Sequence, residues 1–118
     1  MMKDLNIYFV GNTEYTPFKS ATIEECYNYL LEKPVISLDI ETTRKFGGKY
    51  GKLEGLSPHL SEIVMLQIGT VDRQYVIDYR ETDVSKLNIL LTDPDRVIVG
   101  QNIKFEYVHL RQNENIRI

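Results

Sequence analysis

Two carboxylates stand two residues apart, at Asp39 and Glu41, where the apolar run over residues 35–40 ends. Successive side chains of a β-strand point to opposite faces, so both acids share one face and the aliphatic side chains share the other. Like charges at this spacing repel, so folding alone gives no reason for the pair. A hard divalent cation such as Mg²⁺ would remove the repulsion by binding the carboxylate oxygens. The alternative is a solvated strand end where both acids face water.

A third acid interrupts the apolar stripe of a helix predicted over residues 103–112. Ile103, Glu106, Tyr107 and Leu110 have the spacing i, i+3, i+4, i+7, which places the glutamate within the stripe. A surface glutamate is usually paired with Lys or Arg three or four residues away, yet positions 102, 103, 109 and 110 hold Asn, Ile, His and Leu. The glutamate therefore either lies at the edge of the stripe, with only its methylenes covered, or faces a site.

Hydrophobic periodicity and turn residues predict the elements that must position these acids. Thr22 and Glu25 fit a capping box at the start of a helix that ends before Pro34. The short connection at residues 70–73 indicates an antiparallel hairpin. The predicted strands are 5–9, 35–40, 62–69, 74–79 and 96–100, and the predicted helices are 23–30, 84–91 and 103–112. The order βαβββαβα predicts an α/β or α+β fold with one mixed sheet.

The composition is that of one globular domain over residues 1–118. Hydrophobic residues make up 42% of the chain, and its 14 basic and 17 acidic side chains give a net charge of −3. An acidic total argues against indiscriminate nucleic-acid binding, so any such contact must come from a local patch. The single cysteine, Cys26, cannot form an intrachain disulfide, which favours a reducing cytoplasm. No apolar run is long enough to span a membrane, so no membrane partner is expected.

The connection over residues 42–61 is long for a compact domain, and such loops are usually functional or disordered. Its segment at residues 44–52, RKFGGKYGK, contains no acid. The basic side chains could contact phosphates, and the aromatic rings could stack on bases. The alternative is a flexible loop whose charges only keep it in solution. The candidate substrate contacts are Arg44, Lys45, Phe46, Lys49 and Tyr50.

Two runs resemble the first and second motifs of the DEDD-type 3′-5′ exonucleases. They are V-I-S-L-D-I-E-T-T at residues 35–43 and V-I-V-G-Q-N-I-K-F-E at residues 97–106. This family has a ribonuclease H-like fold and includes the proofreading domain of family A DNA polymerases. The runs E-I-V-M-L-Q-I-G-T and Q-Y-V-I-D-Y resemble the second and third strands of that fold, and the insertion at 44–61 is similar to that of phage-encoded members. The resemblance spans essentially the whole chain.

The resemblance implies a two-metal site for Mg²⁺ or Mn²⁺, with Asp39, Glu41 and Glu106 as metal ligands and catalytic acids. Two ions about 3.5 to 4 Å apart can activate the attacking water and stabilise the leaving 3′ oxygen. The residues that the resemblance places beside the terminal nucleotide are Thr42, Thr43, Asn102 and Phe105. For the last two, a helix cap and ordinary core packing are the alternative interpretations.

Three features differ from the family pattern. Glu106 stands where Asp is usual, which moves the carboxylate outward, and Gln101 stands where His is common. The third motif, a Tyr or His followed by Asp on a later helix, has no candidate. The chain stops at Ile118, and the aspartates at positions 72, 78, 93 and 95 all precede the second-motif helix. We therefore expect an exonuclease domain truncated before its C-terminal elements, with weak activity in isolation.

These features lead to the hypothesis of a 3′-5′ exonuclease fragment that hydrolyses 3′-terminal phosphodiesters of DNA, as in proofreading. The expected partners are single-stranded or 3′-terminal DNA, and a polymerase domain or a complementary C-terminal polypeptide. The alternative is a non-catalytic nucleic-acid-binding or assembly module that keeps the fold. Absence of the C-terminal part would leave apolar sheet surface uncovered, which predicts self-association.

Overall fold

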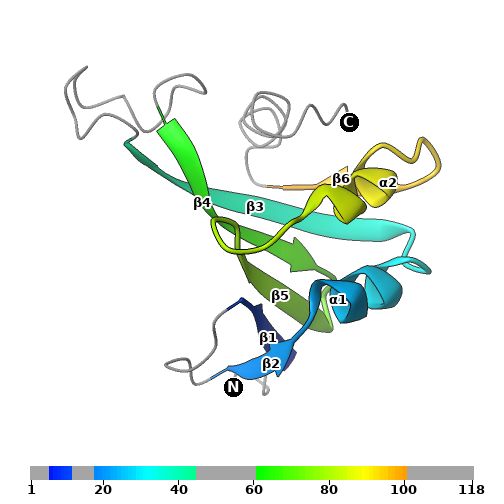
Figure 1. The fold of residues 1–118 in the computed structure, drawn as a ribbon. Helices are drawn as coiled ribbons and strands as arrows, with labels where there is room; N and C mark the ends of the chain where they lie inside the picture. The colour runs from blue at the N-terminus through cyan, green and yellow to red at the C-terminus, as the bar shows by residue number, and fades with distance from the viewer. Residues whose placement is uncertain (1–5, 12–17, 45–60, 101–118) are drawn as a thin grey trace, which may run out of the picture.

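The protein is described from a computed structural model, in residues 6–11, 18–44 and 61–100 (Figure 1). Its strands are β1 (Asn6–Val10), β2 (Lys19–Ala21), β3 (Val35–Arg44), β4 (Ser61–Gly69), β5 (Arg73–Asp78) and β6 (Val97–Val99), and its helical elements are α1 (Ile23–Leu30), the 3₁₀ turn η2 (Ser85–Leu87) and α2 (Asn88–Leu91). The strands form one sheet in the order β2-β1-β5-β4-β3-β6. Strand β4 is antiparallel to β3 and β5, while the other neighbouring pairs are parallel. The predicted mixed sheet is confirmed.

Local sequence signals account for the best-predicted elements. Helix α1 begins with the predicted capping box, in which the Oγ1 of Thr22 accepts from the backbone N–H of Glu25 at 3.1 Å and the Glu25 carboxylate accepts from the backbone N–H of Thr22 at 3.2 Å. The predicted antiparallel hairpin joins β4 to β5, and its turn is closed by a hydrogen bond from the Thr70 N–H to the Arg73 carbonyl at 2.7 Å.

Three elements differ from the prediction. The strand expected at 35–40 continues to Arg44, because β4 pairs with it as far as Ser61, beyond the apolar run. Strand β2 is absent from the prediction, since three residues are too few to show alternation and its partner β1 supplies the pairing. The helix expected at 84–91 is divided into η2 and α2. The helix predicted over 103–112 lies outside the described residues.

The hydrophobic core lies on one face of the sheet, which α1, η2 and α2 cover together (Figure 1). The fully buried large side chains are Tyr75, Leu30, Ile36, Leu38, Ile63, Leu66, Ile68, Ile77, Leu87, Leu90 and Leu91. Cys26 of α1 is also in this core, and burial raises the pKa of its thiol to about 12, so the group is neutral. No helix in residues 6–11, 18–44 and 61–100 is long and apolar enough to cross a membrane.

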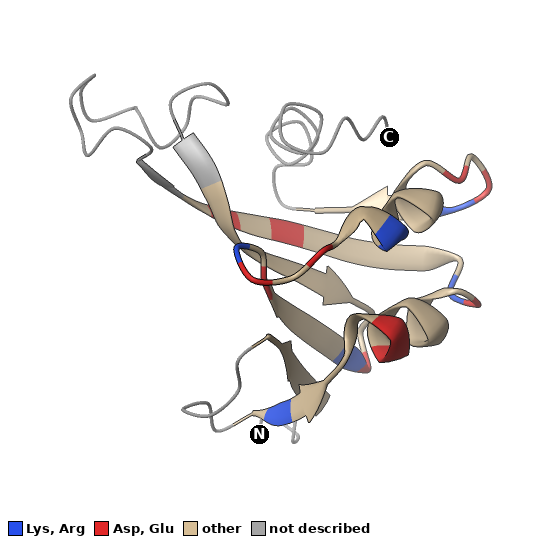
Figure 2. Cartoon of the chain, in the orientation of Figure 1, with Lys and Arg blue, Asp and Glu red and all other residues tan. Residues whose placement is uncertain are grey.

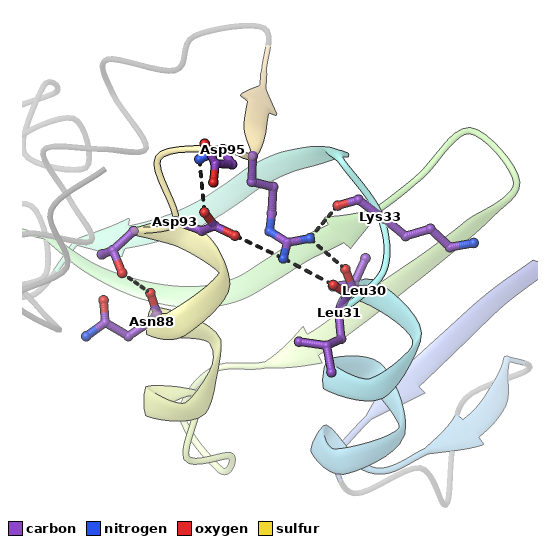
Figure 3. A network of polar contacts seen from close by, with 8 residues as sticks. Leu30, Leu31, Lys33, Asn88, Asp93 and Asp95 are labelled. Carbon is purple, nitrogen blue, oxygen red and sulfur yellow. Dashed lines mark hydrogen bonds and ion pairs between the residues drawn. The ribbon is translucent and has the colours of Figure 1, made fainter.

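Arg96, the residue before β6, is bonded to the end of α1 and to Asp93. Figure 3 shows its labelled partners Leu30, Leu31, Lys33 and Asp93. Its Nη1 donates to the carbonyl of Leu30 at 3.0 Å and to that of Lys33, and its Nη2 donates to the carbonyl of Leu31 at 3.1 Å. The same guanidinium forms an ion pair with Asp93 at 3.3 Å, and the arginine side chain is only 10% exposed. Carbonyl groups at a helix C-terminus have no partner within the helix, and this guanidinium supplies charge-assisted bonds to three carbonyls there. The carbonyl of Leu30 also accepts from the backbone N–H of Lys33 at 3.0 Å.

We predict that Arg96→Met lowers the free energy of unfolding by about 2 to 4 kcal/mol, because the charge-assisted bonds to three carbonyls and to Asp93 are lost. Arg96→Lys should recover only part of this loss, since one ammonium cannot reach the same set of acceptors. Lys86→Met is the control: its ion pair with Glu24 is exposed and should contribute less than about 1 kcal/mol. Urea unfolding followed by circular dichroism measures all three, and equal losses for Arg96→Met and Lys86→Met would contradict the prediction.

Candidate functional site

The predicted acid pair lies on the face of the sheet opposite the helices. Asp39 and Glu41 are both exposed, whereas Ile36, Leu38 and Ile40 between and before them are buried, with at most 6% of each exposed. Figure 2 shows the acidic segments of β3 in red. The Oδ1 of Asp39 accepts from the backbone N–H of Ile40 at 3.0 Å, which restrains its carboxylate. The alternation predicted from the sequence is confirmed, and we call this side of the sheet the carboxylate face.

The register of three antiparallel strands decides which side chains surround the two acids. Side chains that are paired across neighbouring strands point to the same face. Three rows therefore cross the carboxylate face from β3 through β4 to β5: Ser37, Gly69 and Gln74; Asp39, Gln67 and Val76; Glu41, Met65 and Asp78. The middle row places the carboxamide of a glutamine directly opposite the first acid.

A β-bulge interrupts the ladder next to the second acid. Glu41 pairs with Met65, but Thr42 pairs with Ile63, so one residue of β4 is extra. The bulge lets Ile63 and Leu66 both be buried despite their three-residue spacing. Bulges increase the local twist and are frequent beside active sites, where they change the direction of a strand. Here the bulge lies in β4, opposite the step from Glu41 to Thr42.

A chain of hydrogen bonds links the polar side chains of the first two rows. The Nε2 of Gln67 donates to the Oε1 of Gln74 at 3.3 Å. The Nε2 of Gln74 donates to the carbonyl of Thr70 at 2.5 Å and to the Oγ of Ser37 at 3.2 Å. The Ser37 hydroxyl in turn donates to the carbonyl of Gly69 at 3.2 Å. We call Gln67, Gln74 and Ser37, with these two carbonyls, the amide relay.

An open pocket of about 380 Å³ lies over the relay and the first acid. A volume of this size can hold a small ligand or part of a nucleotide. Strand β6 provides one apolar wall, since Val99 pairs with Ser37 and has 45% of its surface exposed. The residues that line the pocket are Ser37, Leu38, Asp39, Gln67, Gln74, Val99 and Gly100. The pocket therefore combines a carboxylate, amide donors and acceptors, and an apolar surface.

The donor set suits a hard divalent cation. Asp39 and Glu41 offer exposed carboxylate oxygens, the ligands that Mg²⁺ and Mn²⁺ prefer. Within the described residues, the ion pairs join Lys86 to Glu24 and Arg96 to Asp93, so neither acid of the pair is neutralised there. The same residues contain no group of three or more His, Cys, Asp or Glu arranged to hold a metal. Two carboxylates are thus in place, and the third predicted ligand, Glu106, lies outside the described part.

The remaining predicted site residues are only partly described. Thr42 is half-buried, and the alternation of β3 assigns its side chain to the face of Ile40, so only its main chain can serve the carboxylate face. The backbones of Thr43 and Arg44 belong to β3, and their side chains are not described. The predicted site residues outside the described ranges are Lys45, Phe46, Lys49, Tyr50, Asn102, Phe105 and Glu106.

Sequence reasoning missed Gln67 and Gln74 as members of the site. One signal was available for Gln67, because it is the polar residue in the apolar run M-L-Q-I-G and its neighbours Leu66 and Ile68 are buried. Its position opposite Asp39, however, depends on the strand register. Strands β3 and β4 are separated by residues 45–60 in the sequence, and the bulge shifts their register, so counting residues from the end of β3 cannot supply it.

Comparison with known structures shows which fold the chain has. The catalytic core of RRP6 from Trypanosoma brucei aligns with 96% of this chain at a TM-score of 0.64 and 15% identity, and 27% of its own length is covered. The EXD2 exonuclease domain aligns with 96% of the chain at a TM-score of 0.63 and 18% identity, with 53% of its length covered. NrnC from Brucella melitensis, with bound Mg²⁺, aligns with 92% at a TM-score of 0.56 and 19% identity, with 44% covered. The sheet is thus that of a ribonuclease H-like DEDD exonuclease fold.

The family follows from the sequence. A family model described as 3′-5′ exonuclease matches residues 15–118, and the chain therefore belongs to the 3′-5′ exonuclease family. No curated protein sequence matches the chain significantly. The chain spans about half or less of the length of the similar structures described above. Its resemblance to the DEDD-type exonucleases, expected from the two motifs, is confirmed.

We predict that Asp39→Asn leaves the free energy of unfolding within about 0.5 kcal/mol of the wild type in metal-free buffer. The substitution removes the repulsion with Glu41, and the asparagine oxygen can still accept from the N–H of Ile40. Leu38→Ala, one residue away on the buried face, should lower the free energy of unfolding by about 2 to 5 kcal/mol. Urea unfolding distinguishes them, and a loss of similar size in Asp39→Asn would mean that the acid has a structural role.

Proposed function

We propose that this chain is part of a 3′-5′ exonuclease domain that hydrolyses 3′-terminal phosphodiesters of DNA with Mg²⁺ or Mn²⁺. The observation that carries the proposal is the exposed pair Asp39 and Glu41, which shares one strand face beside the pocket and has no cationic partner among the described residues. The match to the 3′-5′ exonuclease family supports the reaction class. The chain covers about half or less of the length of the similar structures, so the catalytic activity is proposed for the complete domain.

In this proposal the residues of the chain hold the reacting groups in position. Asp39, Glu41 and Glu106 would bind two metal ions, and the apolar wall and the amide relay would hold the terminal nucleotide within the pocket. When bound, the ions supply a more acidic water and neutralise charge on the leaving oxygen. Water adds to the terminal phosphorus as the bond to the 3′ oxygen of the preceding nucleotide breaks, so a nucleoside monophosphate leaves.

Further residues would guide the strand to this site. Asn102 and Phe105 would orient and pack the second-motif helix, and the main chain at Thr42 and Thr43 would hydrogen-bond the terminal nucleotide. Arg44 ends β3, and Lys45, Phe46, Lys49 and Tyr50 come directly after it in the sequence, so these charges and rings would contact phosphates and bases near the pocket. These side chains carry most of the positive charge close to the acids in sequence, which suits a strand that must approach two carboxylates.

A non-catalytic nucleic-acid-binding or assembly module is the second candidate. The observation that favours it is Glu106, which stands where the family pattern has Asp, so the extra methylene moves its carboxylate outward from the acid pair. Such a module would bind strands through the same basic segment without releasing nucleotides. A polymerase domain or a complementary polypeptide that carries the third motif is the partner that would complete the site.

We predict that the 118-residue chain shortens a 5′-labelled single strand of DNA slowly, one nucleotide at a time, in the presence of Mn²⁺ and not of EDTA. Asp39→Ala should reduce the rate by at least about 100-fold, because a ligand of the reacting centre is lost. Asp78→Asn removes a charge from the same face two strands away and should change the rate by less than about twofold.

The outcomes of this assay separate the two candidates. A polypeptide that carries the third motif, added in trans, should raise the rate in the wild type and not in Asp39→Ala. Strand binding without nucleotide release, with or without that polypeptide, would favour the non-catalytic module. Equal release by wild type and Asp39→Ala would contradict the proposed site. A matched RNA strand tests whether DNA is the preferred substrate.

We predict that the isolated chain self-associates through an apolar strip on β3 and β6. Val35, Val97 and Val99 share the carboxylate face and are 48%, 54% and 45% exposed. Sedimentation velocity should show concentration-dependent dimers or larger species, and Val97→Glu should shift them toward monomer. Val71→Glu is the control, since Val71 is 94% exposed in the β4–β5 turn and belongs to neither β3 nor β6. A wild-type chain that stays monomeric at all concentrations would contradict the prediction.

A further inference from the structure

The amide relay has a direction that two backbone carbonyls impose. A carbonyl oxygen can only accept a hydrogen bond, so the group of Gln74 that faces the Thr70 carbonyl at 2.5 Å must be its NH₂. The hydroxyl of Ser37 has a single proton, which it donates to the Gly69 carbonyl at 3.2 Å. The Oγ of Ser37 can therefore only accept from Gln74, and it does so from the same NH₂ group at 3.2 Å. Both contacts select one orientation of the Gln74 carboxamide. Its Oε1 consequently points toward β4 as an acceptor.

The orientation of Gln74 in turn determines that of Gln67. Because the Oε1 of Gln74 can only accept, Gln67 approaches it with Nε2, at 3.3 Å. The relay therefore uses the amide nitrogen of Gln67 and leaves its Oε1 as the acceptor at the end of the chain of bonds. Gln67 is exposed, lines the pocket and pairs across the strands with Asp39. Cβ atoms of such a pair are about 4.5 to 5.5 Å apart.

We propose that Gln67 is a positioning residue whose Oε1 accepts a hydrogen bond from a water bound to the divalent cation on Asp39. The inference rests on the proposed function, because it requires that Asp39 bind the cation. Mg²⁺ keeps several of its waters when it binds to one or two carboxylates, and each of these waters is a strong donor. A carboxamide free to rotate would present its NH₂ as often as its oxygen, and an NH₂ repels such a water. Gln74 and the two carbonyls prevent this rotation and hold an acceptor beside the acid.

The test is a titration of the 118-residue chain with Mn²⁺, followed by the electron paramagnetic resonance signal of the free ion. Gln67→Met keeps the length of the side chain and removes the acceptor, and it should weaken Mn²⁺ binding by about tenfold, as outer-shell substitutions do. Gln74→Met leaves Gln67 free to rotate and should weaken binding by a smaller factor. Asp78→Asn is the matched control for charge on this face and should stay within about twofold of the wild type.

A second measurement needs no variant of Gln67. In a ¹H–¹⁵N correlation spectrum, the side-chain amide signals of Gln67 should shift when Mg²⁺ is added to the wild type, because hydrogen bonding at Oε1 changes the polarity of the NH₂ group. The signals should stay unchanged when Mg²⁺ is added to Asp39→Ala. Thermal unfolding without metal shows whether each variant is folded before its affinity is compared.

The outcomes separate this inference from the proposed function. If Mn²⁺ binding by the wild-type chain does not depend on Asp39, both the proposed metal site and the role of Gln67 are overturned. The role of Gln67 alone would be overturned if Mn²⁺ binding depends on Asp39 but is equally strong in Gln67→Met and wild type. In that case the amide signals of Gln67 would not shift when Mg²⁺ is added. Weaker binding in folded Gln67→Met, together with the amide shift, would support both.

Discussion

The register between β3 and β4 is the constraint on which the rest of the structure depends. Three aliphatic side chains of β3 are buried against the helices, and a slip of one residue would exchange them with Asp39 and Glu41. Such a slip would place two like charges in the core, where the loss of hydration is far larger than the repulsion they have at the surface. Burial of the core therefore also determines which residues face the pocket. The acids are positioned by the buried apolar residues that alternate with them along β3.

The Arg96 network extends this constraint to β6. Its bonds to the carbonyls at the end of α1 hold the residue that precedes β6, and the N–H of Val97 also donates to the Pro34 carbonyl at 2.8 Å. Strand β6 then runs parallel to β3 and brings Val99 beside Ser37. One wall of the pocket thus depends on a buried cation that lies at the opposite end of the strand. Stability and site geometry are coupled through this short edge strand.

Local patterns in the sequence predicted the capping box of α1, the β4–β5 hairpin and the face that carries Asp39 and Glu41, because each depends on residues close together in the chain. They could not predict β2, whose pairing is supplied by β1, or the extension of β3 to Arg44, which depends on β4. The position of Gln67 opposite Asp39 could not be predicted from the sequence for the same reason. It results from pairing across strands and from a bulge that no periodicity shows.

Gly69 links the hairpin to the polar side of the site. A Cβ at this position would lie 2.2 Å from the carbonyl oxygen of Arg73 and 2.8 Å from the Cα of Gln74, so a side chain would force the two strands apart at the turn. The close approach that glycine allows brings the carbonyls of Gly69 and Thr70 next to Ser37 and Gln74, where they direct the amide relay. Backbone carbonyls cannot rotate as side-chain amides can. The orientation of the Gln74 carboxamide beside the pocket is therefore determined by backbone groups of the hairpin.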